Sequence, residues 1–165
     1  MPVTTLTVAD EIAEVLIARL ETLTIEGTEQ TTVVEVVRST RLGTYTPQDL
    51  QIVVQQANPE LVPELMCPGN PPAEAWRLVF NLYLHMMPSE SNTEDIDAIR
   101  NRFVADVRKV ICQPVATWHN FGGYAINAEF EAMQNIESGE SVGGIMLPLS
   151  VIYRTDEGNP YNVRA

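Results

Sequence analysis

The segment Ala75–Met87 carries apolar side chains at every second position, and this pattern constrains the fold more than any other feature of the sequence. A strand points alternate side chains to opposite faces. One face holds Trp76, Leu78, Phe80, Leu82, Leu84 and Met86, and the other holds Arg77, Val79, Asn81, Tyr83, His85 and Met87. Because both faces carry aromatic rings, we expect a central strand that is covered on both sides or pairs with a partner. Pro88 ends it.

Two segments show the three- and four-residue periodicity of amphipathic helices. The first spans residues 8–23, and Thr7 followed by Asp10 is typical of a capping box. The second spans residues 91–111 and has acids near its start, bases near its end and Pro114 just beyond, which suits a helix dipole and a helix stop. Its candidate caps are Ser91 and Thr93, and its predicted buried stripe is Ile96, Ile99, Phe103, Val107, Val110 and Ile111.

Shorter segments predict the remaining strands. The stretches 31–38 and 50–56 are rich in β-branched and apolar residues. Residues 124–133 and 145–155 alternate apolar and polar positions around a glycine-rich turn, so they predict a hairpin. Pro148 lies within the second of these segments and indicates an edge strand or a bulge.

The element order α-β-β-β-α-β-β predicts a single α+β domain over residues 1–165, with two helices packed on a mostly antiparallel sheet. Residues 39–49 are polar and contain Gly43 and Pro47, so we expect a projecting loop or arm there. Residues 57–73 are punctuated by prolines and predict an irregular connection.

Charge and cysteine usage exclude several classes of protein. A formal net charge of −12 argues against a general electrostatic grip on nucleic acid, because that affinity comes from Lys and Arg neutralising phosphates. Cys67 and Cys112 lack CxxC spacing, so we expect free thiols and no thiol zinc site. The polar start of the chain predicts no signal peptide, and its apolar runs are too short or too interrupted to predict a membrane helix.

The sequence offers little for catalysis, and we expect no enzyme, no cofactor and no metal. The common nucleophile-elbow, phosphate-loop and zinc-protease motifs are missing. His85 lies within a strand and suits a structural role, while His119 lies in an aromatic, glycine-rich loop that could hold a ligand or make a packed contact. Asp156, Glu157 and Asn159 form an acidic turn without the ligand spacing of a calcium loop.

The chain is richer in residues that anchor protein interfaces. Nine of its ten basic residues are Arg, which either favours planar contacts at interfaces or reflects base composition. Aromatic residues gather in the loop around residue 120 and again near the C-terminus, where they can anchor an interface or fill the core. The candidate subunit or partner contacts are Trp118, Phe121, Tyr124, Glu129, Glu131, Arg154, Asp156, Glu157, Asn159 and Tyr161. Glu129 and Glu131 suit a solvated face or an electrostatic contact to a neighbouring subunit.

The last third of the chain resembles a known family. The run VIYRTDEGNPY (151–161) is similar to the C-terminal signature of tail terminator and neck proteins of long-tailed bacteriophages, and WHNFGGYAINAE (118–129) is similar to the segment that precedes it. Asn159 stands where that family usually has Asp, which removes a charge from the turn, and residues 61–72 have no counterpart.

The resemblance implies a virion structural protein, made in the host cytoplasm, that forms a homohexameric ring at the head-proximal end of the tail. Such a ring ends tail-tube polymerisation and joins the tube, and a sheath where present, to the head-side connector. Six copies would carry a formal charge of about −72, so DNA could pass the lumen without sticking. Two alternatives stay open: another neck component such as a head-closure or adaptor ring, and a small ligand-binding protein or enzyme that uses the His119 loop.

Overall fold

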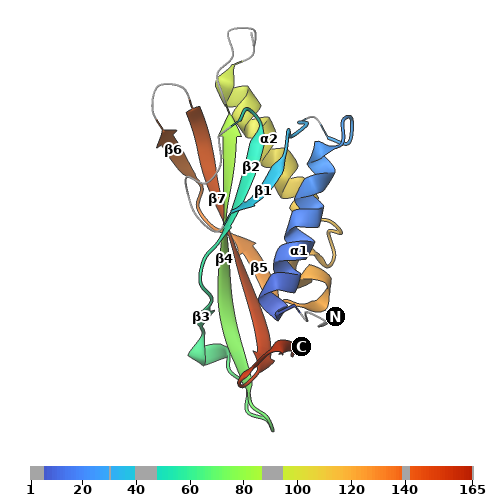
Figure 1. The fold of residues 1–165 in the computed structure, drawn as a ribbon, viewed down its shortest axis with the longest axis vertical. Helices are drawn as coiled ribbons and strands as arrows, with labels where there is room; N and C mark the ends of the chain where they lie inside the picture. The colour runs from blue at the N-terminus through green and yellow to red at the C-terminus, as the bar shows by residue number, and fades with distance from the viewer. Residues whose placement is uncertain (1–5, 30, 40–47, 87–94, 139–141, 165) are drawn as a thin grey trace, which may run out of the picture.

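The computed structural model describes residues 6–29, 31–39, 48–86, 95–138 and 142–164. It has an α+β fold in which two α-helices pack against one face of a mostly antiparallel eight-stranded sheet (Figure 1). In chain order the elements are α1 (Val8–Glu21), the 3-10 helix η1 (Thr22–Thr24), β1 (Val36–Ser39), β2 (Gln51–Gln56), β3 (Glu60–Leu61), η2 (Pro63–Leu65), β4 (Ala73–Met86), α2 (Ile96–Ile111), η3 (Trp118–Gly123), β5 (Asn127–Phe130), β6 (Gln134–Ser138), β7 (Val142–Asp156) and β8 (Asn159–Val163).

The long strands β4 and β7 form the spine of the sheet. They pair antiparallel along their whole length, from Ala73 opposite Asp156 to Met86 opposite Gly143. β2 extends the sheet beyond β4, and β1 then pairs with β2 in parallel. Along its other edge, β7 pairs with β5, β6 and β8, each at a different segment. β3 pairs with the lower part of β4. The prediction of a mostly antiparallel sheet is confirmed, but the predicted order omitted β3, β6 and β8.

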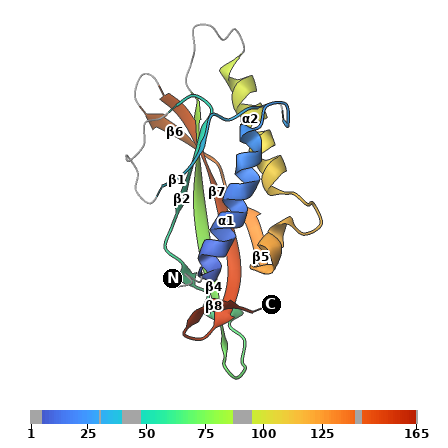
Figure 2. The same ribbon diagram turned by 45° about the vertical axis from the view of Figure 1, so that its right-hand side comes forward.

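The two helices lie side by side on one face of this sheet (Figures 1 and 2). The even-numbered side chains of β4 from Leu78 to Met86 are buried beneath them, together with the odd-numbered side chains of β7 from Ile145 to Tyr153. Those two sets are cross-strand partners, so they share a face. The period-two prediction for β4 is therefore confirmed on this face.

The other face of β4 is only partly covered. Val79, Asn81 and Tyr83 are half-buried there, and among the described elements no helix lies over them. The central position of β4 is confirmed, coverage by a second layer is not found in the described part of the chain, and pairing with a partner stays a prediction.

The helix ends follow from capping. The Thr7 side chain accepts a hydrogen bond from the Asp10 backbone N–H at 3.2 Å and donates one to the Asp10 carboxylate at 2.7 Å, which confirms the capping box. The second helix starts later than predicted, because Asp95 provides the cap by accepting from the Asp97 N–H at 3.1 Å. Ile96 is consequently 47% exposed rather than buried. The predicted caps Ser91 and Thr93 lie outside the described residues, as does most of the predicted arm at 39–49.

Two strand predictions need correction. The first strand begins at Val36 rather than residue 31, because the preceding backbone bonds elsewhere: Thr31 N–H to the Asp106 carboxylate at 2.8 Å and Val33 N–H to Leu23 O at 2.9 Å. The strand around Pro148 is central, not an edge. Pro148 O accepts from Glu131 N–H, so the missing N–H of the proline faces the gap between β5 and β6.

That gap also changes the predicted hairpin. The strand expected over residues 124–133 is limited to β5, and the chain then re-enters the sheet as β6, which pairs with the other end of β7. None of the helices in the described ranges combines the length and the hydrophobicity of a membrane-spanning segment.

Candidate functional site

The predicted aromatic loop is packed into the domain. The indole of Trp118 stacks on the ring of Phe130, with centroids 5.8 Å apart and planes 21° apart. The Arg19 side chain ties this loop to α2, because it donates to Trp118 O at 3.0 Å and to Ile111 O at 2.8 Å. Tyr124 is half-buried and packs against the same core.

Phe121 is a wrong prediction for a partner contact. Its side chain is fully buried, and the Arg19 guanidinium lies 4.7 Å above its ring centroid. The backbone there adopts φ 46° and ψ 51°, a left-handed conformation that turns the ring inward. Its neighbour His119 is half-buried and meets Trp118 edge-on, at a centroid distance of 6.3 Å.

Glu129 and Glu131, at the end of β5, differ in their exposure and contacts. Glu129 is exposed, whereas Glu131 just beyond β5 forms an ion pair with Arg77 on β4. Arg77 also donates through Nε to Ser150 Oγ at 3.0 Å. Glu131 therefore has a partner within its own chain, on the sheet face that the helices leave uncovered.

The C-terminal signature folds as one hairpin, in which β7 turns through Gly158 into β8. Gly158 has φ +70°, a conformation that favours glycine. The Asn159 side chain accepts from the Tyr161 N–H at 3.2 Å, and Glu157 N–H donates to Pro72 O at 2.9 Å. The predicted turn at 156–159 is thus confirmed, and it is fastened to the connection between β3 and β4.

Two residues of this signature have internal partners. The Asp156 side chain accepts hydrogen bonds from Arg164 and from Asn162 at 2.7 Å, and both bonds lower the pKa of its carboxyl. Asp156 is buried, so its predicted role as an exposed contact is wrong. Arg154 is half-buried and donates to Leu65 O at 3.2 Å. The exposed members are Glu157, Asn159 and Tyr161, and the Tyr161 side chain is 54% exposed.

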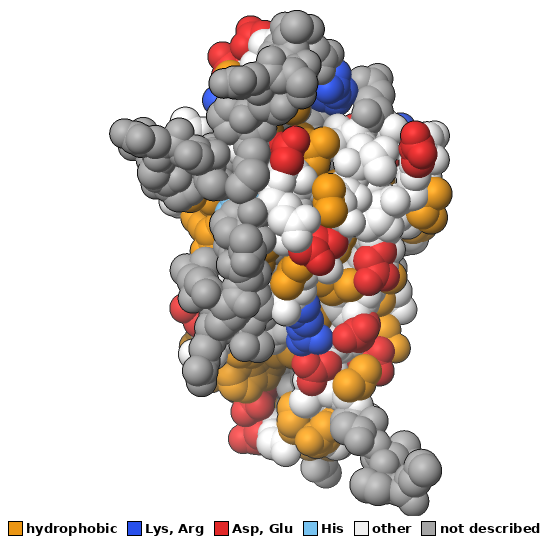
Figure 3. All heavy atoms as spheres, turned by 45° about the horizontal axis from the view of Figure 1, so that its top comes forward, with side chains coloured by type: hydrophobic (Ala, Val, Ile, Leu, Met, Phe, Trp, Pro, Cys, Tyr) orange, Lys and Arg blue, Asp and Glu red, His pale blue; other side chains and the backbone are white. Residues whose placement is uncertain are grey.

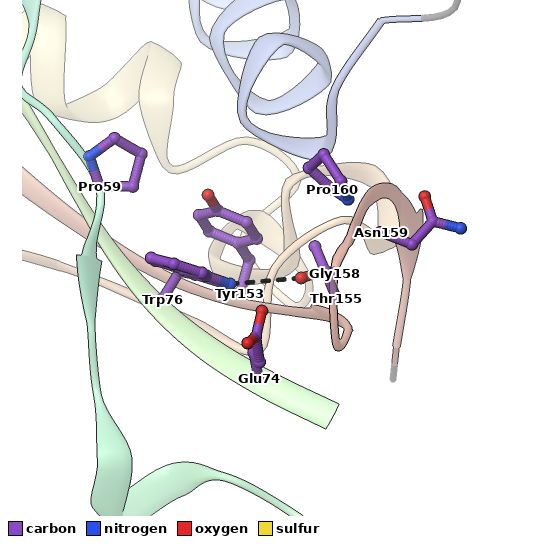
Figure 4. Close-up of a pocket in the computed structure, with 8 residues that line it drawn as sticks. All are labelled: Pro59, Glu74, Trp76, Tyr153, Thr155, Gly158, Asn159 and Pro160. Carbon is purple, nitrogen blue, oxygen red and sulfur yellow. Dashed lines mark hydrogen bonds between the residues drawn. The ribbon is translucent and has the colours of Figure 1, made fainter. Parts of the chain in front are cut away.

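A cavity of about 300 Å³ lies beside this hairpin, past the N-terminal end of α1 (Figure 4). Its floor consists of two cross-strand pairs, Trp76 with Tyr153 and Glu74 with Thr155. The Trp76 indole N–H donates to Thr155 Oγ1 at 3.2 Å. The remaining lining residues are Pro59, Gly158, Asn159 and Pro160.

No pattern in the sequence predicts this cavity. The Trp76 ring fits the alternating pattern of the 75–87 segment, Pro59 falls in the proline-punctuated connection, and Glu74 lies just before the alternation begins. What joins them is the register of strands nearly eighty residues apart, which periodicity does not reveal. Tyr153 was expected on the apolar face and is buried there; burial, with a smaller contribution from the charge of Asp10, raises its pKa to about 12.

The two cysteines and His85 lie in different parts of the fold. Cys67 and Cys112 are free thiols, as predicted, and burial raises the pKa of Cys112. His85 is buried on β4, and burial lowers its pKa. Within the described ranges, no three His, Cys, Asp or Glu side chains come close enough to hold a metal ion.

Comparisons with known proteins add no assignment. No protein-family model matches the chain, and a search of curated proteins finds no significant match.

Proposed function

We propose that this chain is a virion structural protein that forms a homohexameric ring at the head-proximal end of a bacteriophage tail. There it would terminate the tail tube and join the tail to the head. The observation that carries this proposal is the 151–161 signature, whose residues form a continuous unit with an exposed outer side, the end of β7 with its turn and β8.

A closed ring needs a contact between two different surfaces that repeats after a fixed rotation. The free edge of β8 suits one side of that contact. All five residues of β8 are exposed, and among the described strands β8 pairs only with β7. Because Arg164 N–H points to Arg154 O on β7, the adjacent Val163 N–H points away from the sheet and can pair with a neighbouring chain.

The charge of the chain fits a conduit for DNA. Acidic side chains are spread over the face seen in Figure 3 among apolar ones, and basic side chains are sparse there. A lumen lined with such acids would repel phosphates and let DNA slide. The proposed partners are further copies of the chain, the tail tube, a sheath where one exists and the head-side connector, with no membrane and no specific DNA contact.

The edge contact can be tested with a matched pair of variants. In Val163→Pro the outward N–H is removed while the ladder with β7 keeps its inward donors, whereas Val163→Thr keeps both the N–H and the branched shape. Light scattering of the purified full chain is expected to give about six times 18.3 kDa for the wild type and Val163→Thr, and a smaller mass for Val163→Pro.

Circular dichroism must show that Val163→Pro remains folded. A wild-type chain that stays monomeric at every concentration would contradict the proposal, and a ring unchanged in Val163→Pro would exclude this edge. Capture by isolated tail tubes, rather than by head-side connectors, would separate a terminator from a head-closure or adaptor ring.

A further inference from the structure

The cavity beside the C-terminal hairpin has the composition of a site for an organic cation. The residues of its floor have further cross-strand partners on both sides. Leu61 of β3 pairs with Trp76, and Val163 of β8 pairs with Thr155. Paired residues share a face, so these two side chains flank the cavity. Both are large and apolar, with exposures of 44% and 41%.

The acid in this cavity has no internal partner in the described chain. Glu74 is half-buried, and none of the described side chains forms a hydrogen bond or ion pair with its carboxylate. Figure 4 shows this carboxylate directed toward the Trp76–Thr155 pair. The nearest bases along the hairpin are already engaged, Arg154 with Leu65 O and Arg164 with Asp156. The cavity therefore keeps an uncompensated negative charge.

The aromatic walls favour a flat cation. A guanidinium group stacks on the face of an indole or phenol ring more readily than the compact, strongly hydrated ammonium of Lys. Trp76 and Tyr153 supply those rings, and Pro59 and Pro160 close the sides (Figure 4). The Tyr153 ring carries no charge at neutral pH, and burial raises the pKa of its hydroxyl to about 12.

We propose that this cavity receives an arginine side chain from a partner protein, with its guanidinium between the two rings and paired to Glu74. The exposed apolar side chains of Leu61 and Val163 beside the cavity favour a protein as the source, because anchor side chains in interfaces enter pockets that neighbouring apolar contacts shield from water. This inference does not depend on the ring assembly, since the cavity lies within a single chain.

The test uses two pentapeptides, acetyl-Gly-Ser-Arg-Ser-Gly-amide and the same peptide with citrulline in place of arginine. Citrulline keeps the length and planarity of the side chain but carries no charge. Binding is followed by NMR on the indole N–H signals of the full chain, with Trp76 and Trp118 distinguished through Trp118→Phe. We expect the arginine peptide to shift the Trp76 signal in a saturable way and to leave the Trp118 signal in place.

Two variants separate the site from general electrostatic attraction. Glu74→Gln removes the carboxylate in the cavity and should weaken binding of the arginine peptide about fivefold, the effect of one partly exposed ion pair. Glu21→Gln removes the same charge from an exposed residue at the far end of α1 and should leave binding unchanged.

Equal binding of the arginine and citrulline peptides would overturn the proposal. So would equal weakening by the two variants, or an unmoved Trp76 signal at saturating peptide. Peptide binding and oligomeric state are separate readouts, so failure of peptide binding would leave the ring proposal standing, and a monomeric chain would leave the arginine site standing.

Discussion

Replacing Phe121 by Ala tests whether the aromatic loop belongs to the core. The ring is fully buried and lies under Arg19. Removing a buried Phe side chain costs about 3–5 kcal/mol through lost burial and the cavity left behind. Losing the contact between the ring and the Arg19 guanidinium adds at most about 1 kcal/mol to this cost. A surface role for this ring would predict a change below about 0.5 kcal/mol.

Urea unfolding followed by circular dichroism measures the difference. With a slope of about 2 kcal/mol per molar urea, the midpoint of Phe121→Ala should fall by about 1.5–2.5 M. Val115→Ala is the matched control, because Val115 precedes the same loop and is 73% exposed. The measurement is repeated at several protein concentrations, since association adds concentration-dependent stability. A midpoint as high as that of Val115→Ala would refute the assignment of Phe121 to the core.

Three further predictions concern buried polar groups. Asp106→Ala leaves the buried Thr31 N–H without its acceptor and should lower the free energy of unfolding by about 1–3 kcal/mol, measured by urea unfolding; an unchanged midpoint would contradict this. Tyr153 should titrate near pH 12 in ultraviolet absorbance. Because burial raises its pKa above the unfolded value near 10, its contribution to the free energy of unfolding is present below pH 10 and lost between pH 10 and 12. Tyr153→Phe should remove that titration, and a midpoint near 10 in the wild type would be inconsistent with its burial. Arg164 lowers the pKa of Asp156. The resulting contribution to the free energy of unfolding is present above the unfolded-state pKa near 4 and is lost as the pH falls through the lower folded-state pKa. Arg164→Gln should therefore make stability fall less steeply in acid, and an acid dependence equal to that of the wild type would show that the bond has no such effect.

Local patterns predicted the elements whose stabilising contacts are near in sequence. The cap of α1 involves Thr7 and Asp10, three residues apart, and the alternation of β4 follows from its own side chains. Two short strands, β6 and β8, were missed although each pairs with a nearby part of β7. β6 is polar, and β8 is exposed throughout, so neither shows an apolar pattern before it pairs with β7.

The same limit applies to the candidate site. An aromatic ring suits a core and an interface equally well, so composition could not tell buried Phe121 from exposed Tyr161. Glu131 lacked a visible partner because Arg77 lies 54 residues away in the sequence. The cavity at Trp76 depends on the register of β4 with β7, which brings together residues 77 positions apart.

The most direct test of the central proposal is the shape of the assembled particle. Negative-stain images of the purified full chain, averaged without imposed symmetry, should show a closed ring with six equivalent lobes around a central hole. Open filaments, isolated single domains or compact dimers at the same concentration would contradict a ring that closes at the end of a phage tail.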